Sequence, residues 1–254
     1  HPPRRSLVTR RGLWIARLAT AAAVLLGAGL AAADPTLPAA APASSGPGSA
    51  LTMVGLLTVA TLLPAAVLAC TCFVRFVVVL GFVRTGLGTP SAPPNQILVG
   101  LALFLAAVVA APVASEVYDR AGRAYLAGQL DERAALEAAT PPIRAFLLAH
   151  TTPRDLALFY EATSTPRPAT VAEVPLRIAI PAFVIAELRL AFQIGLTMLL
   201  PFLVIDLVAA TVLTALGMVM VPPQVIALPI KLLVFVMIDG WHLVVQSLLR
   251  GAAA

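Results

Sequence analysis

The sequence predicts an all-α, polytopic membrane protein, because of its composition, the length of its apolar runs and its scarcity of charge. Of its 254 residues, 60% are hydrophobic and 11% are charged, and the mean hydropathy is +0.96. Soluble domains carry about a quarter charged residues. A membrane helix needs about 20 apolar residues, and several runs here are longer. We expect long kinked helices and helical hairpins with a small exported helical domain, all assembling into a helical channel complex.

The first 33 residues have the pattern of a secretory signal peptide. Five arginines precede a short apolar core at about 18–30. Three alanines then lead up to a predicted cleavage between Ala33 and Asp34. An uncleaved first membrane helix is the alternative, although the apolar core is short for a span.

Positive charge is concentrated in that leader. The whole chain has 17 Lys and Arg against 12 Asp and Glu, and five of the arginines precede residue 34. The remainder is neutral, so no nucleic-acid partner is predicted. The two histidines beyond the leader, His150 and His242, form no cluster with the cysteines or with a nucleophile. No P-loop or dinucleotide motif appears, so we predict no cofactor, no metal and no enzyme.

Residues 34–50 are rich in Ala and Pro and are expected to form a flexible exported segment. Residues 51–114 form the first predicted hairpin. Its first apolar run, 51–83, is too long for a straight crossing and must tilt, kink or leave the bilayer. A second apolar run, 97–113, is predicted to cross back and complete the hairpin. The rigid turn between them is formed by Pro93, Pro94, Asn95 and Gln96.

Most of the remaining charges lie in residues 115–175, which we predict to be a small exported helical domain. Its clearest helix start has Thr152 as the N-cap and Pro153 at the first helical position. A second amphipathic helix begins near Asp131 and is expected to be interrupted by Pro141 and Pro142.

Residues 176–250 form the second predicted hairpin. The run 176–220 is interrupted by Pro181, Glu187, Arg189, Pro201 and Asp206, so two helices or a kinked hairpin are expected there. Pro222 and Pro223 make the next turn, and 226–249 is expected to be one last helix. Met218 and Met220, just before that turn, offer either a soft seal for a pore or ordinary core filling.

Six charged residues lie inside the apolar runs. They are Arg75, Glu187, Arg189, Asp206, Lys231 and Asp239. Charge at membrane depth costs at least a few kcal/mol unless it is paired or wetted, so a role in ion pairing or assembly is predicted. Glu187 and Lys231 are the expected pair, within or between subunits; snorkelling of both to an interface is the alternative. Glu187 and Arg189, two residues apart, are expected to face different directions.

The order of motifs resembles the FliP family of bacterial flagellar biosynthetic proteins. The resemblance covers roughly residues 51–249. The matching segments are 84–89 (RTGLGT), 93–96 (PPNQ), 101–105, 175–177, 186–188, 191–195, 201–208 (PFLVIDLV), 221–223, 227–232 and 239–241 (DGW).

This resemblance implies a subunit of the type III protein export gate in the inner (plasma) membrane, within the flagellar basal body. Several copies are expected to assemble with FliQ-like and FliR-like membrane proteins around a pore for unfolded flagellar proteins. The family's methionine-rich gasket falls on Met218 and Met220, with Val219 where a third methionine is common. Outside the resemblance, a self-sufficient small-solute or ion transporter that uses the intramembrane charges is the alternative.

Overall fold

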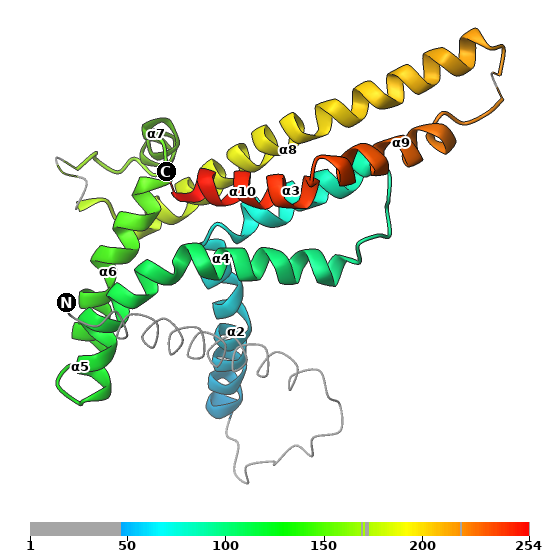
Figure 1. Cartoon of the computed structure of the whole chain (residues 1–254). Coiled ribbons are helices and arrows are strands. Elements are labelled where there is room, and N and C mark those ends of the chain that lie inside the picture. Colours follow the sequence, from blue (N-terminus) through cyan, green and yellow to red (C-terminus); the bar gives the residue numbers. More distant parts are fainter. Residues whose placement is uncertain (1–46, 169, 171–172, 219, 254) are drawn as a thin grey trace, which may run out of the picture. The chain divides into compact units, whose positions relative to one another are not determined.

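The computed structural model describes residues 47–168, 170, 173–218 and 220–253. The predicted signal peptide and its cleavage at Ala33 and Asp34 lie outside them. Every regular element in the described part is a helix (Figure 1), which confirms the all-α prediction. The chain divides into two units, 1–56 and 57–254; the described part of the first is the beginning of helix α2.

The first long apolar run forms two helices with a break between them. Helices α2 (Pro47–Ala69) and α3 (Phe73–Leu87) are bent by 70° at residues 70–72. The expected kink therefore falls at the two cysteines, which lie in the break and not inside a helix. Both thiols are free, and Cys72 is buried. Helix α3 ends at Gly88, whose φ of 75° is a conformation that favours glycine.

Helix α4 (Asn95–Val117) continues through the π-helical turn η1 (Tyr118–Gly122) into α5 (Arg123–Leu126). Together they form one helical segment of 32 residues. The expected domain start at residue 115 thus lies inside a helix. Of the predicted turn, Pro93 and Pro94 precede α4, whereas Asn95 and Gln96 are its first two residues.

Helix α6 (Glu132–Ala149) runs through Pro141 and Pro142, so the predicted interruption is wrong. Pro142 is buried, and the helix packs against α4 and against α8. This packing offsets the hydrogen bonds that the prolines remove. Helix α7 (Pro153–Ala162) confirms its predicted start, because the Thr152 hydroxyl accepts a hydrogen bond from the backbone N–H of Asp155.

Helix α8 (Leu176–Ala215) is one continuous helix of 40 residues. The expectation of two helices or a kinked hairpin is therefore wrong. Pro181 and Pro201 each remove a single backbone hydrogen bond, and the packing of α3 along α8 compensates for this loss.

The last apolar run is also divided differently from the prediction. It forms α9 (Gln224–Met237) and α10 (Gly240–Ala253), which are bent by 65°. Asp239 at the break has a φ of 51°, which ends α9 in the left-handed region. A Cβ on Gly240 would lie 2.2 Å from the Phe235 ring, so only glycine fits this bend.

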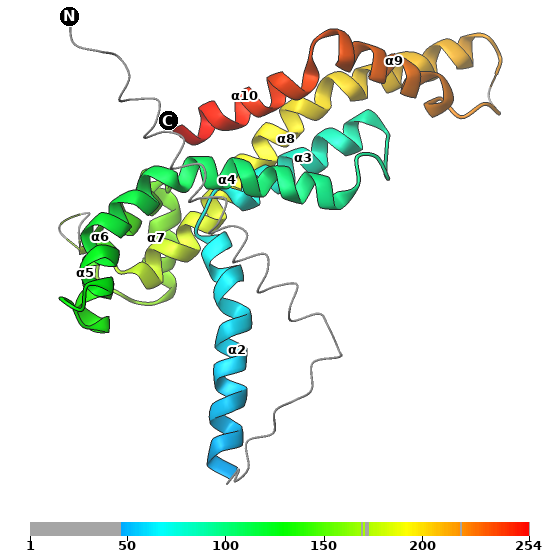
Figure 2. The same cartoon turned by 60° about the horizontal axis from the view of Figure 1, so that its bottom comes forward.

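Helices α3 and α8 form the centre of the second unit and run parallel (Figures 1 and 2). Phe82 lies over Gly195 and Phe202 lies over Gly86, at 2.3 Å and 2.6 Å from where a Cβ would be. Glycine at these two positions lets the helices approach closely. Helices α4, α9 and α10 complete the main core, and a second buried cluster joins α6 and α7 to the start of α8.

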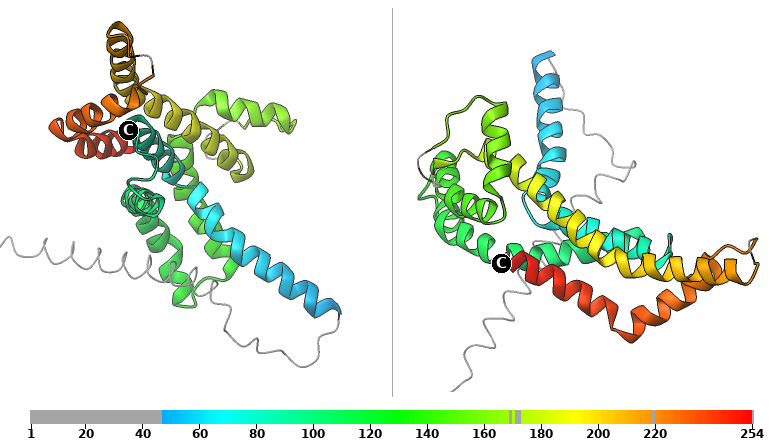
Figure 3. Two further views of the ribbon diagram at one scale, coloured as in Figure 1. Left: turned by 90° about the vertical axis from the view of Figure 1, so that its right-hand side faces the viewer. Right: turned by 90° about the horizontal axis from the view of Figure 1, so that it is seen from above.

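Two helical segments in the described part, Asn95–Leu126 and Leu176–Ala215, are long and apolar enough to cross a membrane. Each of the two bent pairs would add one crossing. Figure 3 shows α8 extending beyond α3 to the connection with α9. This far half of α8 exposes Leu196, Leu200, Leu203, Val204, Leu207, Val208 and Val212, and Leu216 at its C-cap is exposed as well.

Candidate functional site: buried ion pairs and the methionine connection

Arg75 and Glu187 form a fully buried ion pair between α3 and α8. The Arg75 Nε donates to Glu187 Oε2 at 2.8 Å, and Nη2 donates to Oε1. The remaining nitrogen, Nη1, donates to the Gly251 carbonyl in α10 at 2.7 Å. The bidentate geometry is the strong form of this interaction. One guanidinium therefore fixes three helices to one another.

The predicted pairing of Glu187 with Lys231 is not present within this chain. Lys231 Nζ donates instead to Asp206 Oδ2 at 2.6 Å, which links α9 to α8. Along a straight helix, Glu187 and Asp206 lie about 28 Å apart. Because α9 follows α8 through a short connection and folds back beside its far half, Lys231 reaches Asp206 and not Glu187.

Arg189 pairs with Asp155, in the first turn of α7. Its Nη1 donates to Asp155 Oδ2 at 3.0 Å, and Nη2 donates to Oδ1. This pair docks α7 on α8. Glu187 and Arg189 thus contact different partners, as their spacing predicted.

Asp239 is the member of the six without an ion pair within the described residues. Its carboxylate is exposed at the bend between α9 and α10. Pairing among the six is therefore incomplete. Two pairs form within the set of six. The partner of Arg189 is Asp155, which lies outside the apolar runs, and an acidic residue in a polar segment does not stand out in the hydropathy pattern.

Met218 and Met220 lie in the connection from α8 to α9. Their residues are 46% and 94% exposed, so neither fills the core of this chain. Gly217 turns the chain with a φ of 74°, and Pro222 and Pro223 lead into α9. The connection presents two flexible thioethers at the far end of the longest helix.

Comparison with known proteins identifies the family of this chain. The model of the FliP family matches residues 56–248. The chain belongs to the FliP family. This confirms the resemblance drawn from the order of motifs, and the matched range contains both methionines and all three ion pairs.

Close relatives within the FliP family come from distant bacteria. The flagellar biosynthetic protein FliP of Caulobacter vibrioides is 48% identical over 231 residues, which are 85% of this chain and 87% of that protein. The Pectobacterium carotovorum protein of the same name is 50% identical over 77% of this chain and 76% of its own. The Bacillus subtilis one is 45% identical over 80% and 92%.

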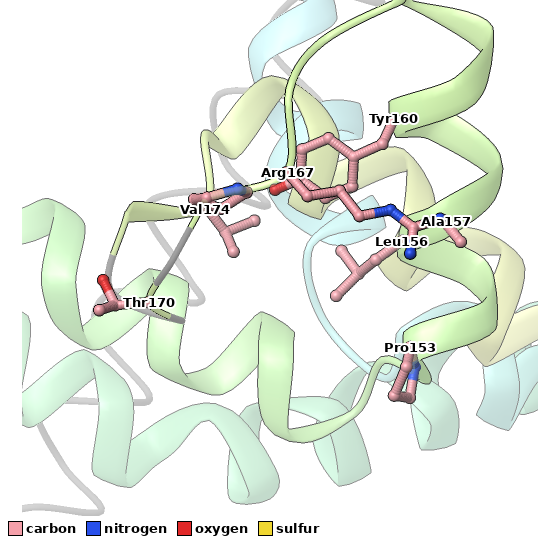
Figure 4. Close-up of a pocket in the computed structure, with 8 residues that line it drawn as sticks. Pro153, Leu156, Ala157, Tyr160, Arg167, Thr170 and Val174 are labelled. Atoms are coloured by element: carbon pink, nitrogen blue, oxygen red, sulfur yellow. The ribbon is translucent and has the colours of Figure 1, made fainter.

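A hollow of about 240 Å³ lies beside α7 in this FliP family member (Figure 4). Leu156, Ala157 and Val174 contribute to its mainly apolar wall. The Tyr160 hydroxyl there is buried and has no hydrogen-bond partner among the described residues, and burial raises the pKa of Tyr160. No group of three or more metal-ligating side chains is present in the described residues. The hollow has the character of a packing defect between α7 and the segment that follows it.

The Asp155 pair predicts an acid-sensitive docking of α7. Burial raises the pKa of Asp155, but the hydrogen bonds from Arg189 and Thr152 outweigh this effect and hold the pKa below its ordinary value. Such a group stabilises the fold above the unfolded-state pKa, and this stability is lost as pH falls through the folded-state pKa. After correction for the intrinsic pH dependence of exchange, we expect local opening of α7 to become more frequent below about pH 4.

In Asp155→Asn, the corrected amide exchange of α7 should already be fast at neutral pH and should change little as the pH falls. Glu161→Gln is the matched control. Glu161 also lies on α7, but its ion pair with Arg167 is exposed. An Asp155→Asn protein with wild-type protection at neutral pH would contradict the docking role.

Proposed function

We propose that this member of the FliP family is a pore-forming subunit of the flagellar type III protein export gate. In this role it conducts unfolded flagellar proteins across the inner membrane. The observation that carries the proposal is the exposed methionine connection of a chain whose relatives, at 45–50% identity, are named flagellar biosynthetic proteins. A polypeptide in transit varies in width, and thioether side chains adapt to irregular surfaces.

The ion pairs serve this role by holding the helices in fixed positions relative to one another. An export pore must keep its helices in register while a chain moves past them. Arg75 with Glu187 joins α3, α8 and α10, and Lys231 with Asp206 holds α9 beside α8. Removing one partner of a buried pair is strongly destabilising, so these pairs resist local sliding. The chain needs no catalytic group for this work.

The far half of α8 and much of α9 expose contiguous large apolar side chains. Patches of this kind mark membrane or protein contacts. We infer that further copies of this chain, together with FliQ-like and FliR-like proteins, cover part of this surface, and that lipid covers the rest. The assembly belongs to the flagellar basal body and has unfolded flagellar proteins as its substrate.

A self-sufficient small-solute or ion transporter fits the charges less well. A proton or ion relay needs groups that exchange partners over the width of the membrane. Here Glu187 is occupied on both oxygens by Arg75, and the next carboxylate, Asp206, is about 28 Å further along α8.

The test is the native mass and composition of the tagged protein after extraction from its own membrane in mild detergent. We expect a large complex that contains several copies of this chain and two other small hydrophobic proteins. A stable, partner-free monomer or dimer would contradict the export-gate role. Substrate-driven ion flux through that purified chain would establish the transporter in its place.

A further inference from the structure

The last turn of α10 is held by side chains from two other helices. Arg75 on α3 donates to the Gly251 carbonyl at 2.7 Å. The Nε2 of His150, at the C-cap of α6, lies 3.1 Å from the carbonyl oxygen of Ala252. The last carbonyls of a helix have no intrahelical partner, and the helix dipole favours cations there. Both contacts use these properties.

His150 faces a carbonyl oxygen at each ring nitrogen. Besides the contact to Ala252, its Nδ1 lies 3.0 Å from the Phe146 carbonyl one turn back on α6. Carbonyl oxygens only accept hydrogen bonds, and a neutral imidazole has one N–H to donate. An imidazolium has two. The geometry is therefore complete only when His150 is protonated, and in the neutral ring one nitrogen lone pair faces an oxygen.

The aromatic surroundings fix the ring in this position. The imidazole stacks on Phe146 with centroids 4.6 Å apart and lies edge-on to Phe183 at 6.2 Å. The residue is half-buried, so its ring stays accessible to protons. Rotation of the ring away from either carbonyl would break this packing.

Among the described residues, the two buried carboxylates on neighbouring helices are already paired. Glu187 on α8 is occupied by Arg75, and Asp155 on α7 is occupied by Arg189. The neighbouring helices also carry Arg75 on α3, Arg144 on α6, Arg154 on α7, Arg177 and Arg189 on α8, and Arg250 on α10, and the Cys70 thiol packs in the cluster beside α6 and α8. The two carbonyls are the hydrogen-bond acceptors that the ring nitrogens face.

We propose that His150 is a proton-dependent clasp that fastens the end of α10 to the end of α6. The protonated ring bridges Phe146 and Ala252. Loss of one proton removes one of the two bonds and leaves the last turn of α10 attached through Arg75. The clasp rests on this geometry and stands independently of the export role.

The test is amide hydrogen exchange of the full chain, measured by mass spectrometry in the complex extracted from its membrane. After correction for the intrinsic pH dependence, local opening of residues 249–253 should be about tenfold more frequent at about pH 8 than at about pH 5.5. His150→Gln removes the titratable ring, so its exchange should not change between the two pH values.

His242→Gln is the matched control, since His242 is exposed on the same helix and makes no hydrogen bond within the described residues. It should keep the wild-type pH dependence. Equal protection of the wild-type helix end at both pH values would overturn the clasp. Loss of the pH dependence in His242→Gln, or its survival in His150→Gln, would overturn it as well. The wild-type comparison decides the matter even if His150→Gln does not assemble.

Discussion

Replacing Glu187 with Gln is expected to lower the free energy of unfolding by about 3–5 kcal/mol, because it leaves a buried guanidinium without its counter-charge. Arg75 is completely buried, and its other acceptor among the described residues is the Gly251 carbonyl. The loss should appear as a lower unfolding temperature of the protein in detergent and as a reduced yield of the assembled complex. Wild-type stability of this variant would show that Arg75 finds another partner.

Asp206→Asn provides the comparison with a less buried pair. The Asp206 side chain is 37% exposed, so water that reaches this position can replace part of the lost carboxylate contact, although the Lys231 side chain itself is only 6% exposed. The destabilisation by Asp206→Asn should be clearly smaller. An equal or larger loss would mean that the assembled complex buries the Lys231 pair more deeply than the single chain does.

A double substitution separates charge from packing. Arg75→Met with Glu187→Leu removes both charges while roughly keeping the volume, and such exchanges are often neutral or stabilising. We expect the double variant to recover most of the stability that Glu187→Gln loses. The recovery should be incomplete, because the Gly251 carbonyl loses its donor. A double variant as unstable as the single one would assign the effect to packing and not to the unpaired charge.

Local features of the fold were predictable because they depend on neighbouring residues alone. The Thr152 cap and the Pro153 start need only three or four residues in the right order, and they are present as expected. The apolar runs likewise identified the long helices. The helix breaks were harder to place. Pro181 and Pro201 are tolerated inside α8 because α3 packs along it, whereas the break after α9 falls at Asp239 and Gly240, a dipeptide typical of turns that the long apolar run obscured.

The partners of the charges could not be read from the sequence, because they depend on the register between helices. Arg75 and Glu187 meet because α3 and α8 run parallel with Gly86 and Gly195 as close contacts. Asp155 and His150 were missed as members of the site for a different reason. Each lies in a polar segment, where an ionisable residue is ordinary, and only the docking of α7 and α10 gives them buried or half-buried partners.

Replacing both Met218 and Met220 with Ala is expected to make the assembled gate leak ions and small molecules. Both side chains project from the connection at the end of α8, and the substitution removes most of their reach. The double variant should leak more than either single one, because each thioether covers part of the same opening. The measurement is ion or dye flux into vesicles that contain the purified complex.

Met237→Ala is the matched control, since Met237 is also strongly exposed but lies at the opposite end of α9 from the connection. It should leave the flux unchanged. Wild-type permeability of the Met218→Ala, Met220→Ala complex, with its native mass intact, would count against a sealing role. A leak in the Met237 variant would indicate a general loosening of the assembly.

Leucine at the same two positions tests whether the seal depends on the volume of the side chains or on their flexibility. Met and Leu are close in volume, so a seal that depends on filled space should survive Met218→Leu with Met220→Leu. A seal that must close around chains of changing width depends on the unbranched, flexible thioether, and the branched leucines should then leak during export while staying closed at rest. The residue between the two positions is Val219, a stiff β-branched side chain, so these two methionines must supply the flexibility of this connection. We therefore expect the leucine variant to be tight without substrate and leaky with it. Equal flux in both states would assign the role to volume alone.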